Sequence, residues 1–321
     1  NIQQLPDVVI VPSDFAGLNI INVSPISDEL LHPDLSKSAI ESSKVDGISR
    51  GVPLIYGNHL LLYYNKKLIK KPAMSWEKLV AQQSELATDK NIIGWNYMEM
   101  YWLIPFLGAY DAFPYKNGKV TLNTEGMVAA LTHYKKFIEQ GLVEQFCDHD
   151  CNMNKFRNGE IGYLINGTWA FKQLNDSLGD DLGIALLPRF SGNPMKTYFS
   201  SHLMSFPSNG LRGFKQKELT ELARFVQSKK AQNIIWESLN AIPTNTVVLQ
   251  KLKQSNNANV VTMLTQLEYA EPMPNEQNMA IVWEAILKGL NRYLADVFDE
   301  RGAAEYMQYV AKKSIDYANQ E

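Results

Sequence analysis

The segment Ile161–Phe171, followed by Leu182–Phe190, constrains the fold more than any other part of this sequence. It begins with an apolar run typical of a buried strand, continues through Asn166-Gly167 as a predicted tight turn, and places Trp169 at a helix start. A second apolar run then ends at a proline. This order predicts an α/β fold, in which ligands bind at the edge of a sheet. Trp169 is expected at that edge, where its flat apolar face suits a sugar ring.

Other apolar runs repeat this organisation along the chain. Asp7–Val11, Leu60–Tyr64 and Asn91–Trp95 are short and rich in β-branched or large apolar residues. Such runs are typical of strands that are buried on both faces. They predict mostly parallel sheets flanked by helices.

Helix boundaries follow from capping residues and apolar spacing. Ser75 and Thr124 are the predicted N-caps of two helices, because their hydroxyl oxygens can accept from the free amides of a first turn. Further helices are expected at 217–239 and 277–318, the second interrupted near 299–302.

Composition places the chain among globular proteins and argues against two classes of partner. With 321 residues, of which 45% are hydrophobic and 20% charged, the chain is long enough for two domains. Its formal net charge of −3 gives no basic surface of the kind that binds nucleic acid or an anionic membrane. No apolar run is long enough to span a bilayer.

The sequence contains no recognisable catalytic motif. None of its five histidines stands in a His-Glu-x-x-His arrangement, and there is no Gly-x-Ser-x-Gly elbow or phosphate-binding glycine loop. No cofactor is therefore expected, and a binding protein is favoured over an enzyme.

Cys147 and Cys151 enclose His149 in the sequence Cys-Asp-His-Asp-Cys, which leaves three interpretations open. A local disulfide suits an oxidising compartment. Two free thiols in a loop are the second alternative. A zinc site is the third, although the spacing matches no common zinc module and no fourth ligand is evident.

Motifs spread over most of the chain point to one family. They are Leu5–Val11, Gly51–Gly57, Leu62–Leu68, Met74–Leu79, Phe156–Trp169, Gly183–Gly192, and Met273-Pro-Asn with Trp283 ten residues on. In this order they resemble the extracellular solute-binding proteins of ABC importers, in the branch of maltose- and maltodextrin-binding proteins.

The resemblance implies a two-lobed periplasmic-binding-protein fold of type II, with a hinge between the lobes. The first lobe would take residues 1–57 and 204–250, and the second 58–203 and 251–321. The family normally has about two strands and two helices before the segment at Leu5, so an abbreviated first lobe is expected. Two alternatives stay open for that segment: it lies outside this sequence, or a reduced relative has lost it. The resemblance further implies a periplasmic or otherwise extracytoplasmic monomer. It would carry a carbohydrate, bound in an interlobe cleft, to the membrane subunits of an ABC permease.

The resemblance also assigns ligand-binding residues in the second lobe. Trp169 and Trp283 would stack on sugar rings, while Glu99 and Tyr101 would bind sugar hydroxyls. The apolar helix around Trp283 is equally typical of a core residue, and Glu99 is equally typical of an exposed acid.

In the first lobe, Asp14 corresponds to a ligand-binding carboxylate. Around the hinge crossing the family has an acidic residue that this chain lacks, and the residues found there are Tyr56, Asn58 and His59. Leu287 stands where the maltose binders of the family have an arginine, which argues against maltose itself as the ligand.

Two further functions stay open at this level. The chain could be the extracytoplasmic sensor domain of a signalling receptor, with the same cleft and another output. It could also be a carbohydrate-active enzyme that depends on Glu99 and turns its oligosaccharide over.

Overall fold

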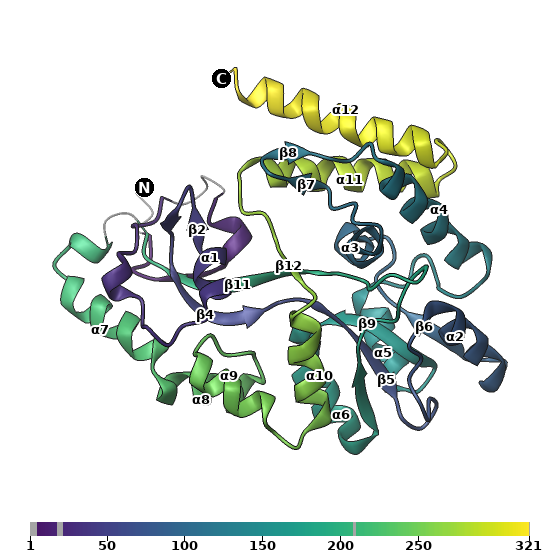
Figure 1. Cartoon of the computed structure of the whole chain (residues 1–321), viewed down its shortest axis with the longest axis horizontal. Coiled ribbons are helices and arrows are strands. Elements are labelled where there is room, and N and C mark those ends of the chain that lie inside the picture. The colour runs from purple at the N-terminus through teal and green to yellow at the C-terminus, as the bar shows by residue number, and fades with distance from the viewer. Residues whose placement is uncertain (1–4, 18–21, 208–209, 321) are drawn as a thin grey trace. The chain divides into compact units, whose positions relative to one another are not determined.

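The chain forms two compact units, each assembled from separate stretches of sequence (Figure 1). A computed structural model describes residues 5–17, 22–207 and 210–320. Unit 1 comprises Asn1–His59, Phe199–Val261 and Pro272–Gln277. Unit 2 comprises Leu60–Tyr198, Thr262–Glu271 and Asn278–Glu321. The backbone therefore passes repeatedly from one unit to the other.

Unit 1 is organised around strand β11 (Tyr198–Ser205), whose first residue belongs to unit 2. β1 (Val9–Pro12) and β4 (Val52–Gly57) both pair with β11 in antiparallel orientation, and β12 (Glu271–Pro272) joins the same sheet. The apolar core beside this sheet contains Ile26, Leu30, Val52, Leu54, Met204, Phe206, Leu219 and Ala223. The other elements are η1 (Ser13–Phe15), η2 (Asp28–Leu30), α1 (Lys37–Ser42), β2 (Lys44–Val45), β3 (Ile48–Ser49), η6 (Gly210–Arg212), α7 (Gln216–Gln227), α8 (Lys229–Leu239) and α9 (Thr246–Lys253).

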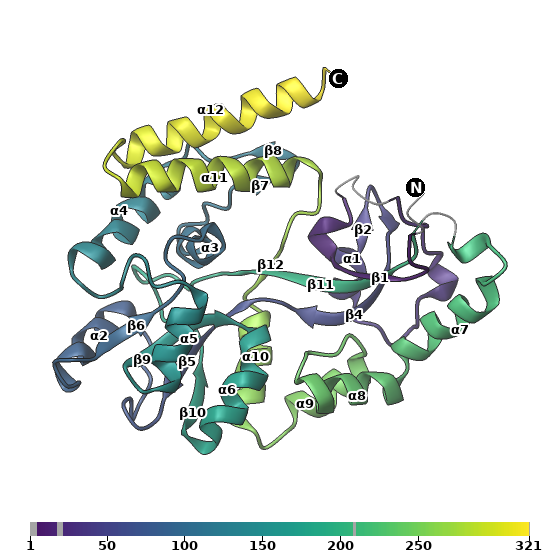
Figure 2. The ribbon, with the colours of Figure 1, turned by 180° about the vertical axis from the view of Figure 1, so that it is seen from behind.

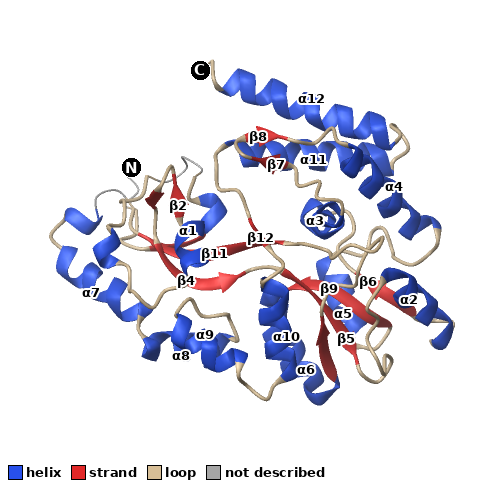
Figure 3. Ribbon diagram, in the orientation of Figure 1, coloured by secondary structure: helices blue, strands red, loops and turns tan. Residues whose placement is uncertain are grey.

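The sheet of unit 2 has the strand order β10-β5-β9-β6; its strands are drawn in red in Figure 3, and all four are labelled in Figure 2. β6 (Asn91–Gly94) pairs in parallel with β9 (Ile161–Gly167). β5 (Leu60–Asn65) pairs in antiparallel with both β9 and β10 (Leu182–Ala185). The expectation of mostly parallel sheets is therefore wrong. β6, β9 and β10 run in one direction, as strands joined through helices do, but β5 enters between β9 and β10 against them.

Helices surround the sheet of unit 2. α5 packs against β9 and α6 against β10, while α11 and α12 lie side by side in both Figure 1 and Figure 2. The helices and short strands are α2 (Trp76–Ala81), η3 (Gln82–Glu85), α3 (Met100–Ala109), β7 (Tyr115–Lys116), β8 (Lys119–Val120), α4 (Glu125–Glu139), α5 (His149–Arg157), η4 (Thr168–Ala170), α6 (Phe171–Leu178), η5 (Gly179–Asp181), α11 (Asn278–Leu294) and α12 (Glu300–Ala318). α10 (Ala258–Leu267) contains residues of both units.

The two predicted N-caps are confirmed, whereas the interruption predicted near 299–302 lies earlier, at 295–299 between α11 and α12. The Ser75 hydroxyl accepts from the backbone amide of Lys78 at 3.4 Å, and that of Thr124 from the amide of Met127 at 3.1 Å. The helical stretch predicted at 217–239 is α7 followed by α8, and the one at 277–318 is α11 followed by α12.

The tight turn predicted at Asn166-Gly167 is wrong. Both residues belong to β9, where they pair with Leu61 and Leu60 of β5. Gly167 has extended dihedral angles, with φ −82° and ψ 171°. An Asn-Gly pair favours a turn only where no neighbouring strand extends the ladder, and here β5 does so.

A disulfide joins Cys147 to Cys151, with 5.2 Å between their Cα atoms. This confirms the first of the three interpretations. The bond spans the start of α5, where Asp148 accepts from the backbone amide of Cys151 at 2.9 Å. Across the described ranges, no helix is both long and apolar enough to cross a membrane.

Candidate functional site

Five aromatic side chains that are far apart in sequence meet in unit 2. Tyr101 lies 6.2 Å, between ring centroids, from both Trp169 and Trp283. Trp102 meets Trp169 edge-on at 6.2 Å, and Tyr198 meets Trp283 in the same way at 6.2 Å. We call these five residues the aromatic cluster. It joins three of the predicted ligand-binding residues: Tyr101, Trp169 and Trp283.

The aromatic cluster has a buried side and an exposed side. Trp102 and Tyr198 are buried, whereas Tyr101 and Trp283 are partly exposed. Trp169 is 43% exposed, which makes it the most exposed member of the aromatic cluster. Its ring is therefore partly open to solvent, while the rings of Tyr101 and Trp102 pack against it.

Helix α3 fixes two members of the cluster. One turn beyond Trp102, Phe106 packs into the buried aromatic core of the unit, with its ring 5.7 Å from Trp76 and 5.5 Å from Trp95. The indole nitrogen of Trp102 donates to the carbonyl of Ile165 in β9 at 2.9 Å. The start of α3 is thus tied to the strand that leads to Trp169.

Gly167 allows Trp169 to fold back over the end of β9. A Cβ atom added at Gly167 would lie 2.0 Å from a carbon of the Trp169 ring. No side chain can be accommodated at that distance without moving the indole. The Trp169 ring can therefore occupy its position only because residue 167 has no side chain.

Glu99 precedes α3 as its N-cap residue, but its side chain makes no capping bond. The residue is partly exposed, and its carboxylate forms no hydrogen bond or ion pair with any residue that the structure describes. A carboxylate without a protein partner is suited to accept from ligand hydroxyls.

In unit 1, Asp14 lies in η1, directly after β1. The neighbouring Ser13 hydroxyl accepts from the backbone amide of Ser201 at 3.1 Å, and the hydroxyls of Ser201 and Ser42 are 2.7 Å apart. These contacts hold η1 against β11 and α1. Burial raises the pKa of Asp14 from 3.8 to about 6, and its Oδ1 has no hydrogen-bond partner among the described residues.

The three residues predicted around the hinge crossing lie in unit 1, at the end of β4 and just after it. Tyr56 meets Phe199 edge-on at 5.4 Å, and burial raises the pKa of its hydroxyl. Asn58 has a left-handed φ of 45° and donates from its amide to the Ser200 hydroxyl at 2.9 Å. His59 is completely buried. Tyr56 and Asn58 are partly exposed, so of the three only His59 has no surface available to a ligand.

Two members of the aromatic cluster are not among the predicted residues. From the sequence, Trp102 could be either a core residue or a ligand-binding residue, and no motif indicates a ligand-binding role for Tyr198. Tyr198 begins a buried strand, so its pattern is that of a core residue. Its position beside Trp283 depends on tertiary contacts between segments 85 residues apart, which no local pattern records.

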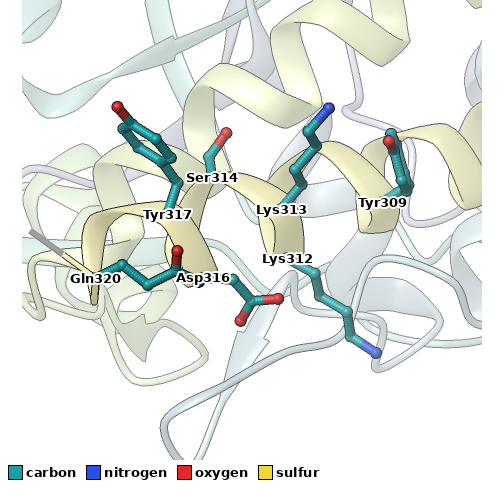
Figure 4. A pocket seen from close by; sticks show the side chains of 7 residues that line it. All are labelled: Tyr309, Lys312, Lys313, Ser314, Asp316, Tyr317 and Gln320. Atoms are coloured by element: carbon teal, nitrogen blue, oxygen red, sulfur yellow. The ribbon is translucent and has the colours of Figure 1, made fainter.

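A hollow of about 720 Å³ follows the last turns of α12 (Figure 4). Its lining residues are Tyr309, Lys312, Lys313, Ser314, Asp316, Tyr317 and Gln320. Six of them belong to α12 and Gln320 follows directly after it, and in Figure 4 their side chains spread in different directions instead of converging. The described chain thus supplies a single wall here, and we do not assign this hollow to the site.

Comparison with known proteins identifies the family. The sequence profile of the bacterial extracellular solute-binding proteins matches residues 7–262. A maltooligosaccharide ABC transporter solute-binding lipoprotein of Streptococcus pneumoniae R6 is 22% identical over 97% of this chain and 77% of its own length. In Bacillus subtilis 168, maltodextrin-binding protein MdxE is 24% identical over 87% of this chain and 70% of its own length. The galactooligosaccharide-binding protein of that organism is 22% identical over 97% of this chain and 77% of its own length. Because the profile match extends over more than half of the sequence, this chain belongs to the bacterial extracellular solute-binding proteins.

Proposed function

We propose that this protein binds an oligosaccharide outside the cytoplasm and delivers it to the membrane subunits of an ABC importer. The observation that carries the proposal is the aromatic cluster of unit 2, in which the half-exposed Trp169 lies beside Tyr101 and Trp283. Such rings match the C–H faces of sugars and lose little conformational entropy on binding. The relatives named above, which bind maltooligosaccharides, maltodextrin or galactooligosaccharides, support this ligand class.

In this proposal, polar groups beside the rings select the sugar by its hydroxyls. Glu99 accepts from ligand hydroxyls, and Tyr101 contributes both its ring and its phenol. Asp14, Tyr56, Asn58 and His59 of unit 1 are proposed as additional contacts. These follow from the family resemblance, and the burial of His59 makes it the least accessible of them.

A tryptophan-fluorescence titration of the full chain tests the proposal. Maltose, maltotriose and a galactosyl oligosaccharide are added to the unaltered protein, to Trp169→Ala and to Phe146→Ala. Phe146 is the matched control, because it is an 84% exposed aromatic residue of unit 2 outside the cluster. We expect saturable binding of at least one oligosaccharide, weakened about tenfold or more by Trp169→Ala and unchanged by Phe146→Ala.

Two results would contradict the proposal. One is the absence of a saturable response to any of these sugars in protein shown to be folded by circular dichroism. The other is equal affinity in the unaltered protein and Trp169→Ala. Chromatography of the sugar after incubation separates binding from catalysis, because a binding protein returns the oligosaccharide intact. Uptake of the bound sugar by cells with and without the gene separates transport from sensing.

A further inference from the structure

A polar pocket in unit 1 is not explained by carbohydrate binding to the aromatic cluster. It has a volume of about 330 Å³ and lies between α7 and the segment that leads into η2. On the α7 side, Gln216, Thr220 and Arg224 are spaced four residues apart and so lie along one face of the helix. Arg212 of η6 adds a second guanidinium to the same wall.

The two guanidinium groups are not neutralised by the protein. Neither Arg212 nor Arg224 forms an ion pair or a hydrogen bond through its side chain with any residue in the described ranges. By contrast, Arg301 of unit 2 binds both carboxylate oxygens of Glu125 at 2.6 Å. The pocket holds a single carboxylate, that of Glu29, so its formal charge is positive.

The pocket rests on a well-packed base. Leu30 and Leu211 line it, and both pack in the apolar core of unit 1 together with Leu219 and Ala223 of α7. The face of α7 that carries Thr220 and Arg224 is thereby fixed relative to η2. The backbone that carries these side chains is therefore in place before a ligand binds, whereas the exposed guanidinium groups of Arg212 and Arg224 become ordered on binding.

We propose that this pocket binds a small oxyanion, either a phosphate or a carboxylate group, carried by a hydroxylated molecule. Guanidinium groups match the geometry of both anions through paired N–H donors. Ser27, Thr220 and Gln216 supply neutral donors, while Glu29 can accept from a ligand hydroxyl and repels a second negative charge. The volume lies at the lower end of the range for ligand pockets, which restricts the occupant to a small molecule.

Calorimetric titration of the full chain at low ionic strength tests this site. The probes are inorganic phosphate, glycerol 3-phosphate and lactate, which separate a free phosphate, a hydroxylated phosphate ester and a hydroxylated carboxylate. We expect saturable binding of at least one probe, with a dissociation constant of about a millimolar or tighter. The double variant Arg212→Gln/Arg224→Gln should weaken it about tenfold or more.

Two further variants make the test specific. Lys217→Gln removes a cation from the same helix that does not line the pocket, and should change the affinity by less than about twofold. Glu29→Gln should strengthen binding of inorganic phosphate relative to glycerol 3-phosphate. The proposal is overturned if no probe binds at about 20 mM, or if the double variant retains the affinity. It is equally overturned if Lys217→Gln loses as much affinity as the double variant. These outcomes do not depend on sugar binding, which is measured separately with Trp169→Ala.

Discussion

Replacing Asp14 with asparagine should stabilise the protein at neutral pH while removing a proposed ligand contact. The perturbation deletes a carboxylate whose pKa is raised by burial from 3.8 to about 6. A shift of about two units corresponds to about 3 kcal/mol between the two protonation states. Because the side chain is partly exposed, we expect about 1–3 kcal/mol at pH 7.

The sign of the pH dependence follows from the direction of the shift. A carboxyl group with a raised pKa binds its proton more tightly in the folded chain than in the unfolded one. Its contribution to stability is therefore fully present below about pH 4 and is lost as the pH rises through about 6. Asparagine does not titrate, so the advantage of Asp14→Asn should grow between pH 4 and pH 7 and then remain constant.

Urea unfolding of both proteins at intervals from pH 4 to pH 8 measures this difference. The matched control is Asp7→Asn, which alters an exposed carboxylate of the same unit that is paired with Lys215 at 2.6 Å. That variant should lose less than about 1 kcal/mol. A free-energy difference for Asp14→Asn that is independent of pH, or a loss of stability at pH 7, would refute the reasoning.

Three further predictions concern the position of the Trp169 ring, the disulfide and a helix cap. Gly167→Ala should displace the Trp169 indole and weaken sugar binding about tenfold, as followed by fluorescence titration, while the far-ultraviolet circular dichroism stays unchanged. Reducing the bond between Cys147 and Cys151 should lower the free energy of unfolding by about 2 kcal/mol, measured in urea with and without reductant, because the closed loop is short. Thr124→Ala should cost about 1 kcal/mol in the same urea assay, and an unchanged midpoint would contradict the assigned cap.

Local features of the fold could be predicted from sequence because their causes are local. The caps at Ser75 and Thr124 depend on a hydroxyl and an amide three residues apart, and both are confirmed. The first five residues of the buried strand β9, Ile161–Ile165, follow from an apolar run, whereas its last two were wrongly predicted as a turn. The strand order could not be predicted in this way, because β5 has the same apolar character whether it lies at an edge or between β9 and β10.

The candidate site was accessible to prediction for a different reason. The family motifs point to Trp169, Trp283 and Tyr101, which the structure brings together in the aromatic cluster. The motifs do not include Tyr198, and they do not indicate the close contact between Gly167 and the Trp169 indole. These depend on packing between distant segments, so they could only be found in three dimensions.

The repeated passage of the chain between its units has a consequence for synthesis on the ribosome. β1 and β4 have no partner for their antiparallel pairing until β11 emerges, about 140 residues after β4 ends. At a translation rate of about 5–20 residues per second, this delay is on the order of 7–30 seconds. During that interval the nascent first unit exposes apolar strands such as Val52–Gly57, which is mostly buried in the finished protein. A holdase that masks unpaired strands would therefore be needed most while the middle of this chain is being made.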